Sequence, residues 1–468
     1  MLTNLKNQPI CVDLDGSLIK NDLSWESLIL FIKQYPLKII TLISLYFKGL
    51  PALKRYIASR VEINPEHLPY NTEVLTFLKN ESKRGIKIYL ATGSDNVYAQ
   101  SVAKYLGVFE KAWGTDKNVN LTRHNKARLL KDELGDKQFI YIGDSTKDFP
   151  VWEVANSIIA INPSKVVKIW IDNSQQLSQF VFNRKPLEKV IFDMVRPHQW
   201  VKNLLIFLPF ILNIKLISFE LTKIALISFV CFCMTASAIY IINDILDLHS
   251  DRDHPKNKDR ALASGKISIV AALNTSGLLI LSSLLFSLLV PHLTLMLVGY
   301  IVITTLYSIE FKKIAFIDVL CLSLLYVYRI LTGCVASGLG CSNWILSFSF
   351  FVFLNLAILK RYTEIAKLGS RRGYQSEDLP LLQQSGLISG FLSVIVFALY
   401  IESEKSHSTF TNPSMLWLMI PALTYFVLIM WQAGVKKSMD YDPILYVLKD
   451  KKTIFTVVYT AIVFLIAL

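Results

Sequence analysis

Residues 224–251 read IALISFVCFCMTASAIYIINDILDLHSD, an apolar run that ends in closely spaced acids. As a helix, this run is long enough to cross a hydrocarbon core about 30 Å thick. On that helix Asp244, Asp247 and Asp251 are expected to point the same way, at the end where the helix dipole is already negative. Their mutual repulsion favours a bound cation such as Mg²⁺, which also binds substrate phosphates. The stretch therefore predicts a metal-dependent site for phosphates in a membrane.

The composition divides the chain into two parts. Hydrophobic residues make up 53% of the 468 residues, the mean hydropathy is +0.42, and the long apolar runs lie after about residue 200. We expect an α/β domain over residues 1–183, followed by an all-α polytopic membrane domain over residues 184–468. The N-terminus, MLTNLKNQPICVDLDG, lacks the apolar stretch of a signal peptide, which predicts that the first domain stays in the cytoplasm.

The membrane domain is predicted to have about nine spans of suitable apolar length. They lie near residues 204–219, 222–243, 268–290, 292–309, 315–337, 343–359, 386–402, 414–433 and 452–468. Alternate loops are rich in Lys and Arg, which assigns these loops to the cytoplasmic side of a bacterial inner membrane. The net charge of +13 then reflects membrane orientation and phosphate binding rather than nucleic acid, for which no motif is present.

The six cysteines show no C-x-x-C pair, and most of them lie in apolar segments. A free cysteine in such a setting packs as a small hydrophobic residue. We therefore expect a packing role for these side chains.

The first domain repeats a pattern of strand, polar turn and helix. The strand at residues 10–12 leads into Asp13-Leu14-Asp15-Gly16-Ser17, a strand at 87–91 ends at Thr92, and a strand at 139–142 precedes Gly143-Asp144-Ser145-Thr146-Lys147-Asp148. Lys126 opens a helical stretch between the last two strands. Strand ends converge at one edge of a parallel sheet, so these acids, the hydroxyl and the lysine are expected to meet around a phosphate.

This ordered set of motifs resembles the haloacid dehalogenase superfamily of phosphatases, over residues 10–165. The resemblance implies a nucleophile, Asp13, that forms a phosphoaspartate, and a general acid and base, Asp15. It further implies Mg²⁺ held by Asp13, the Asp15 carbonyl and Asp144 or Asp148, with Thr92 and Lys126 on the phosphoryl oxygens. The segment from about residue 18 to 75 resembles the helical cap of this superfamily.

Part of that cap is unusually apolar. Residues 31–50 read FIKQYPLKIITLISLYFKGL, a stretch that proline interrupts and that carries several lysines, so it is a poor candidate for a span. Two interpretations stay open: a cap helix that packs on its neighbours, and a helix that lies on the membrane surface.

The membrane domain carries its own resemblance, over residues 190–468, to the UbiA superfamily of intramembrane prenyl-group enzymes. The motifs are Arg196-Pro197-His198-Gln199-Trp200-Val201-Lys202-Asn203, Asn243-Asp244-x-x-Asp247-x-x-x-Asp251, and Tyr307-Ser308 with Lys312. The pattern is most similar to the polyprenyl-phosphate phosphoribosyltransferase branch, with Asp253-His254-Pro255, Lys360-Arg361-Tyr362-x-Glu364 and Asp442-Pro443. Aromatic prenyltransferases of the superfamily carry a second D-x-x-x-D motif, whereas the corresponding loop here, residues 360–378, is mostly basic.

The resemblance implies attack by a polyprenyl phosphate on phosphoribosyl diphosphate. Asp244, Asp247 and Asp251 would hold Mg²⁺ as catalytic residues, and Asn243 would orient ligand or metal-bound water. The remaining substrate-binding candidates are Tyr307 and the phosphate-clamp residues Lys202, Arg260, Lys312, Arg329, Lys360 and Arg361. Each basic residue has an alternative role as a cytoplasmic membrane anchor. Arg329 differs because residues 324–331 around it are apolar, which predicts a partner inside the helix bundle.

The fusion suggests that the phosphatase-like domain removes the 5-phosphate to leave polyprenylphosphoryl ribose. Two other functions remain: an aromatic prenyltransferase fused to an unrelated phosphatase, and a protein that binds or transports lipid phosphates through an ion path. The expected partners are polyprenyl phosphate, phosphoribosyl diphosphate and the bilayer. A homo-oligomer is left open.

Overall fold

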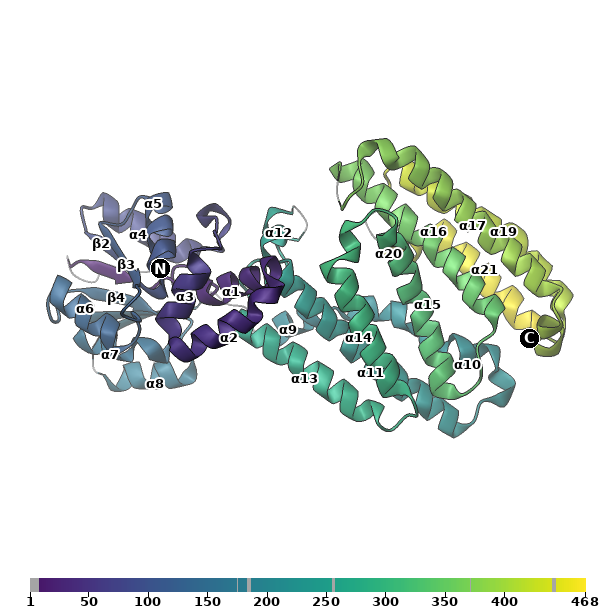
Figure 1. Ribbon diagram of the computed structural model, residues 1–468, viewed down its shortest axis with the longest axis horizontal. Coiled ribbons are helices and arrows are strands. Elements are labelled where there is room, and N and C mark those ends of the chain that lie inside the picture. The colour runs from purple at the N-terminus through teal and green to yellow at the C-terminus, as the bar shows by residue number, and fades with distance from the viewer. Residues whose placement is uncertain (1–7, 175, 183–186, 255–256, 371, 440–442) are drawn as a thin grey trace. The chain divides into compact units, whose positions relative to one another are not determined.

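The computed structural model describes residues 8–174, 176–182, 187–254, 257–370, 372–439 and 443–468 (Figure 1). Its contacts divide the chain into two compact units. The first comprises Met1–Val195 and Tyr240–Gly277, and the second comprises Arg196–Ile239 and Leu278–Leu468. The predicted domain boundary between residues 183 and 184 lies outside the described residues and stays a prediction.

The first unit is built on a six-stranded parallel sheet in the order β3-β2-β1-β4-β5-β6. Its strands are β1 (Ile10–Val12), β2 (Ile88–Asp95), β3 (Lys111–Thr115), β4 (Ile140–Gly143), β5 (Ser157–Ile161) and β6 (Leu177–Val181). The helices that follow the cap segment are α4 (Thr72–Lys83), α5 (Asn96–Leu106), α6 (His124–Leu134), α7 (Phe149–Val154), α8 (Lys165–Asn173) and α9 (Leu187–Val195). The predicted α/β fold is confirmed.

Alternation along the short strands gives the sheet two buried faces. Ile10 and Val12 of β1 contribute to one hydrophobic cluster, and Cys11 between them contributes to the other. Strands buried on both faces need apolar residues throughout, which explains why β1 reads Ile-Cys-Val. Because apolar side chains cover both faces of the sheet, the polar side chains of a site are expected at the ends of the strands.

A helical insertion separates β1 from α4. It contains α1 (Leu23–Gln34), a 3₁₀ helix (Pro36–Lys38), α2 (Ile39–Lys48) and α3 (Leu50–Ala58). Asp22 caps α1 by accepting hydrogen bonds from the backbone N–H groups of Ser24 and Trp25. The chain bends by 116° between α1 and the segment Pro36–Lys48, because Pro36 cannot continue a helix from the preceding residue.

Residues 240–277 belong to the first unit and run from the last turns of one apolar helix, Phe219–Leu246, to the first turns of the next, Ile269–Ser287. They include α12 (Leu248–Asp253), whose Arg252 forms two hydrogen bonds with Glu26 of α1, at 2.9 and 2.6 Å. Both side chains are almost fully buried. Removal of either partner would leave an uncompensated buried charge, so this ion pair stabilises the packing of α12 against α1.

The second unit is helical. Its helices, two of which extend into the first unit, are α10 (Leu208–Leu212), α11 (Phe219–Leu246), α13 (Ile269–Ser287), α14 (Leu293–Ile309), α15 (Ile317–Ser337), α16 (Asn343–Leu368), α17 (Leu379–Ile401), α18 (Glu404–Thr409), α19 (Met419–Val435), α20 (Pro443–Val447) and α21 (Lys451–Ala467). Within the described residues, seven helices are long and apolar enough to cross a membrane, or eight if the bent pair in the cap is one span. The predicted count of nine is therefore approximate.

Two of the expected spans account for the difference. Residues 204–219 do not form one helix, because a 3₁₀ helix (Pro197–Phe207), the five-residue α10 and a further 3₁₀ turn (Ile214–Leu216) share that stretch. Proline within the first turn of α10 favours such a break. The last segment, near 452–468, forms α21, which at 17 residues is at the short end of what spans a bilayer.

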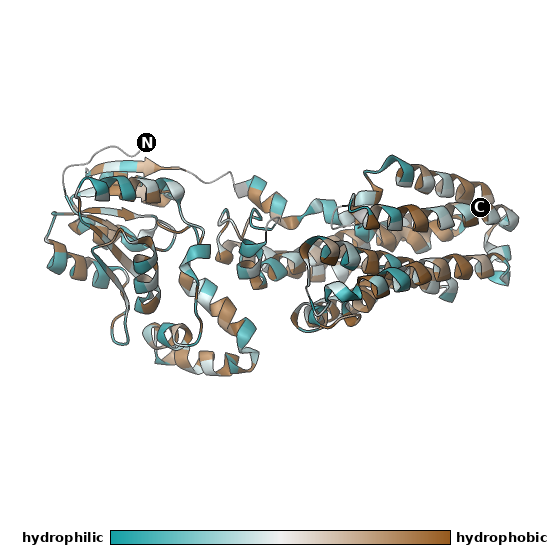
Figure 2. Ribbon diagram, turned by 90° about the horizontal axis from the view of Figure 1, so that it is seen from above, coloured by the Kyte–Doolittle hydropathy of each residue, from teal (hydrophilic) through white to brown (hydrophobic). Residues whose placement is uncertain are grey.

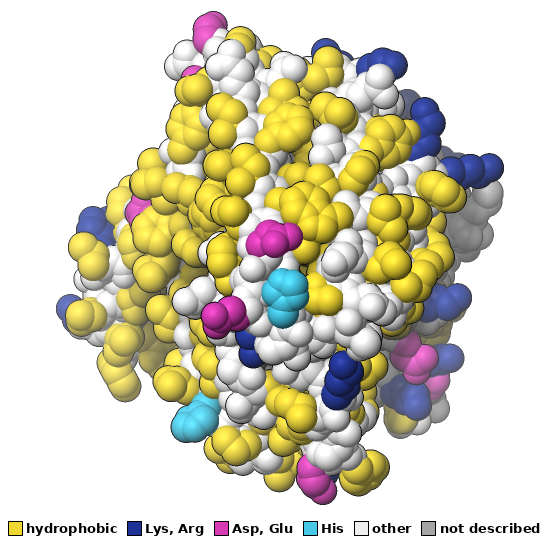
Figure 3. Space-filling model, turned by 90° about the vertical axis from the view of Figure 1, so that its right-hand side faces the viewer, with side chains coloured by type: hydrophobic (Ala, Val, Ile, Leu, Met, Phe, Trp, Pro, Cys, Tyr) yellow, Lys and Arg dark blue, Asp and Glu magenta, His cyan; other side chains and the backbone are white. Residues whose placement is uncertain are grey.

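The outer surface of the second unit is apolar. Its helices are predominantly brown in the hydropathy colouring of Figure 2, and hydrophobic side chains cover much of the face seen in Figure 3. Leu289 and Phe455 are among many large apolar residues that are exposed. In contrast, polar contacts lie between helices, such as the 2.6 Å hydrogen bond between the hydroxyls of Thr235 and Ser283. This arrangement is typical of a multi-pass membrane protein.

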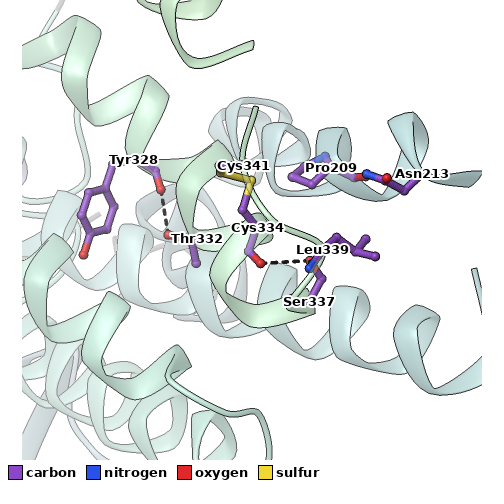
Figure 4. The surroundings of a disulfide bond; sticks show 8 residues. All are labelled: Pro209, Asn213, Tyr328, Thr332, Cys334, Ser337, Leu339 and Cys341. Carbon is purple, nitrogen blue, oxygen red and sulfur yellow. Dashed lines mark hydrogen bonds between the residues drawn. A yellow bond between two sulfur atoms is a disulfide. The ribbon is translucent and has the colours of Figure 1, made fainter. Parts of the chain in front are cut away.

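The structure corrects the prediction for two of the cysteines. Cys334, in the last turn of α15, forms a disulfide with Cys341, just before α16, with their Cα atoms 5.5 Å apart (Figure 4). Gly338 ends α15 in the left-handed conformation (φ +69°), which reverses the chain and returns Cys341 to the helix. A separation of seven residues across a turn has no simple sequence signature. Cys11, Cys231, Cys233 and Cys321 are free thiols.

Candidate active sites

The phosphatase-like site lies at the carboxyl ends of β1, β2 and β4. The predicted residues Asp13, Asp15, Lys126, Asp144 and Asp148 all line one cleft of about 340 Å³. Thr92 is buried beside it and donates a hydrogen bond to Asp15. The order of the sheet, with β1 central and neighbours on both sides, brings together residues that are far apart in the sequence.

Asp13 is held by a network of charged and hydroxyl groups. Its Oδ1 accepts hydrogen bonds from Lys126 Nζ and from the backbone N–H of Leu14, both at 2.9 Å. Lys126 also donates to the Tyr141 hydroxyl at 2.9 Å, and that hydroxyl donates to Asp148 at 3.1 Å. Two donors on one oxygen restrict the orientation of the Asp13 carboxylate, as a nucleophile requires.

Asp15 has different neighbours. Its Oδ1 accepts the backbone N–H of Leu23 at 2.8 Å, and its Oδ2 accepts the hydroxyls of Thr92 at 3.0 Å and Ser94 at 2.7 Å. Leu23 is the first residue of α1, so the cap contributes directly to the position of Asp15. In this structure the Thr92 hydroxyl, predicted to hold a phosphoryl oxygen, donates to Asp15.

Burial perturbs the ionisation of these groups. It raises the pKa of Asp13 to about 7, although the Lys126 ammonium partly opposes the shift. Burial and the nearby Asp22 carboxylate raise the pKa of Asp15 to about 6, while hydrogen bonds from Leu23, Ser94 and Thr92 oppose it. Burial acts to lower the pKa of Lys126, but the carboxylates of Asp13 and Asp148 outweigh it and raise that pKa. A carboxyl whose pKa lies near 6 suits proton transfer close to neutral pH.

Three of the carboxylates can hold a metal ion. One oxygen from each of Asp13, Asp144 and Asp148 lies within 4.8 Å of the others. The close packing depends on Gly16, which has a φ of +80°, because a Cβ at this position would lie 2.3 Å from Asp144 Oδ2. Oxygen donors in a partly buried acidic cluster match the preference of Mg²⁺. The residues therefore fit the predicted metal.

The cleft has two further features. Basic side chains other than Lys126 line it, namely Lys20, Lys54, Arg123 and Lys147. Lys54, from the cap helix α3, donates to Gly93 O at 2.6 Å and to Asn120 Oδ1 at 3.0 Å, and burial lowers its pKa. The cleft is also lined by Ser268, Ile269 and Val270, which lie at the start of α13, a candidate membrane span.

The acids of the opening motif do not all point the same way, which corrects the prediction from helix spacing. α11 ends at Leu246, and Asp247 stands between it and α12. Asp244 and Asp251 both pair with Arg260, at 3.0 and 2.6 Å, whereas Asp247 pairs with Lys33 of the cap at 3.1 Å. Asp247 stands between the two helices with non-helical backbone angles, and its side chain pairs with a residue far away in the sequence.

Arg260 was predicted to bind phosphate, and here its guanidinium lies between two buried carboxylates. Asn257 also donates to Asp251 at 2.8 Å. Carboxylate oxygens such as those of Asp244 and Asp251 suit Mg²⁺. In this structure the Arg260 guanidinium compensates the negative charge that a bound metal ion would otherwise compensate. Asn243 is half-buried in the last turns of α11, and its backbone carbonyl accepts a hydrogen bond from the backbone N–H of Asp247.

Arg329 has the inward-facing partners that its apolar surroundings predicted. It is buried on α15, donates to Asn203 Oδ1 at 2.9 Å and to the Tyr300 hydroxyl at 3.1 Å. The guanidinium also lies 5.2–5.5 Å from the ring centres of Phe232, Tyr300 and Tyr326. Rings and neutral oxygens stabilise the cation without neutralising it, so it can still attract an anion.

Arg361 has a different environment. It is fully buried on α16 and forms ion pairs with Asp318 and Glu364. Tyr374 donates its hydroxyl hydrogen bond to Asp318 and completes the cluster. Two carboxylates already compensate this guanidinium, so its position favours a structural role over a phosphate clamp.

The other predicted residues lie on separate elements. Lys202 is buried in the 3₁₀ helix Pro197–Phe207, and Tyr307 is half-buried on α14. Lys312 lies in the 3₁₀ turn that follows α14, and Lys360 is half-buried on α16 beside Arg361. Of the motif residues, Pro255 and Asp442 lie outside the described residues.

Sequence reasoning missed Ser94, Tyr141, Lys54 and Glu26. Ser94 follows Thr92 by two residues on β2, so the strand period places both hydroxyls on the same side and could have indicated it. Tyr141 was hidden in an apolar strand, and Lys54 and Glu26 lie in cap helices without a motif. Their roles depend on contacts with distant residues.

Comparison with known families agrees with both halves of the chain. Residues 214–455 match the UbiA prenyltransferase family, and residues 11–153 match the haloacid dehalogenase-like hydrolases. The uncharacterized protein y4nM of Sinorhizobium fredii is 30% identical over 98% of this chain and 91% of its own length. The decaprenyl-phosphate phosphoribosyltransferase of Corynebacterium glutamicum is 31% identical over 57% of this chain and 83% of its own length.

Among solved structures, a UbiA homolog from Archaeoglobus fulgidus bound to DMAPP and Mg²⁺ is similar to this chain. It is 18% identical, with a TM-score of 0.44, over 59% of this chain and 98% of its own. The two family matches and the similar curated proteins confirm the resemblances drawn from the motifs for both halves.

Proposed function

The chain belongs to the UbiA prenyltransferase family, and on that premise we propose that its membrane half transfers 5-phosphoribose from phosphoribosyl diphosphate to a polyprenyl phosphate. An oxygen of the lipid phosphate forms a bond to the anomeric carbon, and the bond to the diphosphate breaks. The products are polyprenylphosphoryl-5-phosphoribose and diphosphate. The phosphatase-like half then hydrolyses the 5-phosphate, which yields polyprenylphosphoryl ribose and inorganic phosphate.

In the transfer step, Asp244, Asp247 and Asp251 would hold Mg²⁺, for which Asp247 exchanges its ion pair with Lys33 for the metal, and Asn243 orients the ligand. Mg²⁺, when bound, offsets the charge that grows on the leaving diphosphate. Arg260 pairs with Asp244 and Asp251 and is positioned to exchange these carboxylates for substrate phosphate. The other phosphate-binding candidates are Lys202, Tyr307, Lys312, Arg329, Lys360 and Arg361, of which Arg361 receives the least support because two carboxylates compensate it.

In the phosphatase step, Asp13 attacks phosphorus and the bond to the 5-oxygen of ribose breaks. Asp15 gives its proton to that oxygen and afterwards takes a proton from the water that hydrolyses the phosphoaspartate. Lys126 and Thr92 bind the phosphoryl oxygens, and Asp13, Asp144 and Asp148 would hold Mg²⁺, which would supply further positive charge for those oxygens. The raised pKa of Asp15, about 6, supports the acid and base role.

The residues that line the phosphatase cleft support the proposal of a lipid-linked substrate. The catalytic acids share this cleft with Ser268, Ile269 and Val270, where a candidate membrane span begins. A cleft lined by the first residues of a candidate span suits a phosphate ester that is attached to a lipid. The basic residues Lys20, Arg123 and Lys147 on the same cleft suit a substrate that carries a phosphodiester as well as the phosphate to be removed.

We further propose that the chain is located in a bacterial inner membrane with the phosphatase-like domain in the cytoplasm. The disulfide between Cys334 and Cys341 supports this orientation. It lies in a turn of residues 338–342 that has no Lys or Arg, whereas the neighbouring loops are basic. Disulfides persist in oxidising compartments, so this turn fits the outer side.

The test uses the full-length protein in nanodiscs with Mg²⁺, polyprenyl phosphate and radiolabelled phosphoribosyl diphosphate. We expect label in the lipid fraction, and mass spectrometry should find polyprenylphosphoryl ribose. Asp13→Asn should accumulate the phosphorylated lipid, and Asp244→Asn should transfer about 10²-fold less label. Polyprenyl diphosphate with an aromatic acceptor serves as the alternative substrate pair.

Three outcomes would contradict parts of the proposal. If no label enters the lipid fraction, the proposed phosphoribosyltransferase activity is wrong. If the protein then consumes prenyl diphosphate, it is an aromatic prenyltransferase instead. An unchanged product in Asp13→Asn removes the phosphatase step. Transport of lipid phosphate without diphosphate release, insensitive to Asp244→Asn, favours a transport protein.

A further inference from the structure

The cap presents an apolar surface that its own domain leaves uncovered. We define the cap surface as Leu37, Ile40, Ile43, Tyr46 and Phe47, on α2 and the 3₁₀ helix before it. Leu37 is 93% exposed, Phe47 83% and Ile40 79%. Leu42 is the one buried residue of α2 and Leu45 is half-buried, so few side chains anchor this helix to the core. A soluble domain rarely exposes a contiguous patch of this kind without a partner.

Another helix of the same domain provides a comparison. On α8, Val166 and Ile169 are 62% and 61% exposed, but Val167 and Ile171 of the same helix are buried in the core. Scattered exposed residues on a well-anchored amphipathic helix are normal for a protein surface. The cap surface differs because the exposed residues are the majority of its helix.

The charges around the cap surface are of one sign. Between Glu26 and Glu62 the sequence has no acidic residue. The same segment contains six basic residues: Lys33, Lys38, Lys48, Lys54, Arg55 and Arg60. Lys38 directly precedes α2, and Lys48 is its last residue. An apolar face bordered by lysines is complementary to a bilayer with anionic headgroups.

The dimensions of the segment decide how it meets a bilayer. α2 has ten residues and is about 15 Å long, half the thickness of the hydrocarbon core. The 116° bend before it prevents α1 and α2 from forming one straight span. The same chain carries helices long and apolar enough to span a membrane, so the domain with the cap surface is tethered to a bilayer.

We propose that the cap surface lies in the interface of the anionic cytoplasmic leaflet, with α2 parallel to the membrane and Lys38 and Lys48 among the headgroups. The cap is thereby a lipid-docking element of the phosphatase-like domain. Since Leu23 at the start of the adjoining helix α1 donates to Asp15, the docked segment is continuous with a helix that contacts the active site.

The direct test measures the depth of the cap surface in the bilayer. Single cysteines at Ile40 and Phe47 are labelled with bimane, in a Cys321→Ser background that removes the partly exposed native thiol. The full-length protein is placed in nanodiscs that contain doxyl-labelled lipid quenchers. Ile169→Cys on α8, which is similarly exposed, is the matched control.

We expect severalfold stronger quenching at positions 40 and 47 than at 169, and weaker quenching when anionic lipid is replaced by neutral lipid. Equal quenching at all three positions would overturn the proposal. So would cross-linking of position 47 to a second copy without quenching, because the partner would then be protein.

A second arm rests on the proposed function. The double variant Ile40→Glu/Phe47→Glu should slow hydrolysis of the lipid-linked phosphate, while hydrolysis of a small water-soluble phosphate ester is unchanged. Ile169→Glu should affect neither. Equal loss on both substrates would contradict docking. A protein with no phosphatase activity at all would refute the proposed function, and the quenching experiment would still decide the docking.

Discussion

The two acidic clusters of this chain differ in what brings their carboxylates together. Asp13, Asp144 and Asp148 converge because parallel strands end at one edge of a sheet, and the buried Lys126 partly compensates them. Asp244 and Asp251 lie on consecutive helices and converge on Arg260, while Asp247 turns to Lys33. The first cluster is thus shaped by the sheet, whereas an arginine side chain holds two carboxylates of the second cluster together.

The largest expected effect is loss of the first cluster's nucleophile. Asp13→Asn should lower phosphatase turnover by more than about 10³-fold, as removal of a nucleophile does in other enzymes. Transfer of label into lipid should continue, because that reaction uses the other acids. Scintillation counting and mass spectrometry of the lipid fraction measure both. Asp136→Asn, an exposed carboxylate paired with Lys131, is the control. Parallel loss of transfer would mean that the clusters are not independent.

The second cluster should give the converse result. Asp244→Asn is expected to lower transfer of phosphoribose by about 10²-fold, since it removes one oxygen donor for charge stabilisation. Added polyprenylphosphoryl-5-phosphoribose should still be dephosphorylated. Diphosphate release measures the first reaction and phosphate release the second. Glu220→Gln, an exposed carboxylate in the first turn of the same helix as Asp244, should change neither. Normal transfer in Asp244→Asn would refute the role of this motif.

A substitution of Arg260 tests whether this side chain competes with a metal ion for Asp244 and Asp251. Arg260→Gln should lower the Mg²⁺ concentration for half-maximal transfer, because Asp244 and Asp251 lose their competing cation. It should also raise the KM for phosphoribosyl diphosphate by about tenfold, the cost of one charged hydrogen bond. Titration of transfer with Mg²⁺ at several substrate concentrations separates these effects. If the metal requirement increases instead, Arg260 supports the site rather than competing with the metal.

The smallest effect is expected far from both clusters. Replacing Cys334 and Cys341 by alanine should leave both activities within about twofold and lower stability by about 2–3 kcal/mol, the amount expected for a short disulfide loop. A fluorescence melt and the two activity assays measure this. A large loss of either activity would indicate that the disulfide turn takes part in substrate binding.

Local patterns predicted much of the molecule. The alternation of strands and helices predicted the parallel sheet, apolar length predicted most of the spans, and the turn motifs predicted the carboxylates of the first cluster. These features depend on short segments whose preferences agree with the final fold. Ser94 and Tyr141 were missed because each acts only through a residue of another strand.

Helix periodicity was insufficient for the second cluster. The prediction required one continuous helix through Asp251, whereas α11 ends at Leu246 and Asp247 pairs with Lys33 of the cap. The disulfide was missed for a similar reason, since it forms where a glycine turn reverses the chain. The buried pair of Glu26 and Arg252 joins residues more than two hundred positions apart, and no local pattern predicts such a partner.

The sequence by itself determined the two families, the parallel sheet, the membrane-spanning character of the second half and the acids that carry the chemistry, because motifs and hydrophobic periodicity are local properties. Only the tertiary structure decided which cation each acid meets, that the phosphatase cleft is lined by the start of α13, and that the cap leaves an apolar surface uncovered. These outcomes depend on packing between distant segments, where burial and ion pairing are decided.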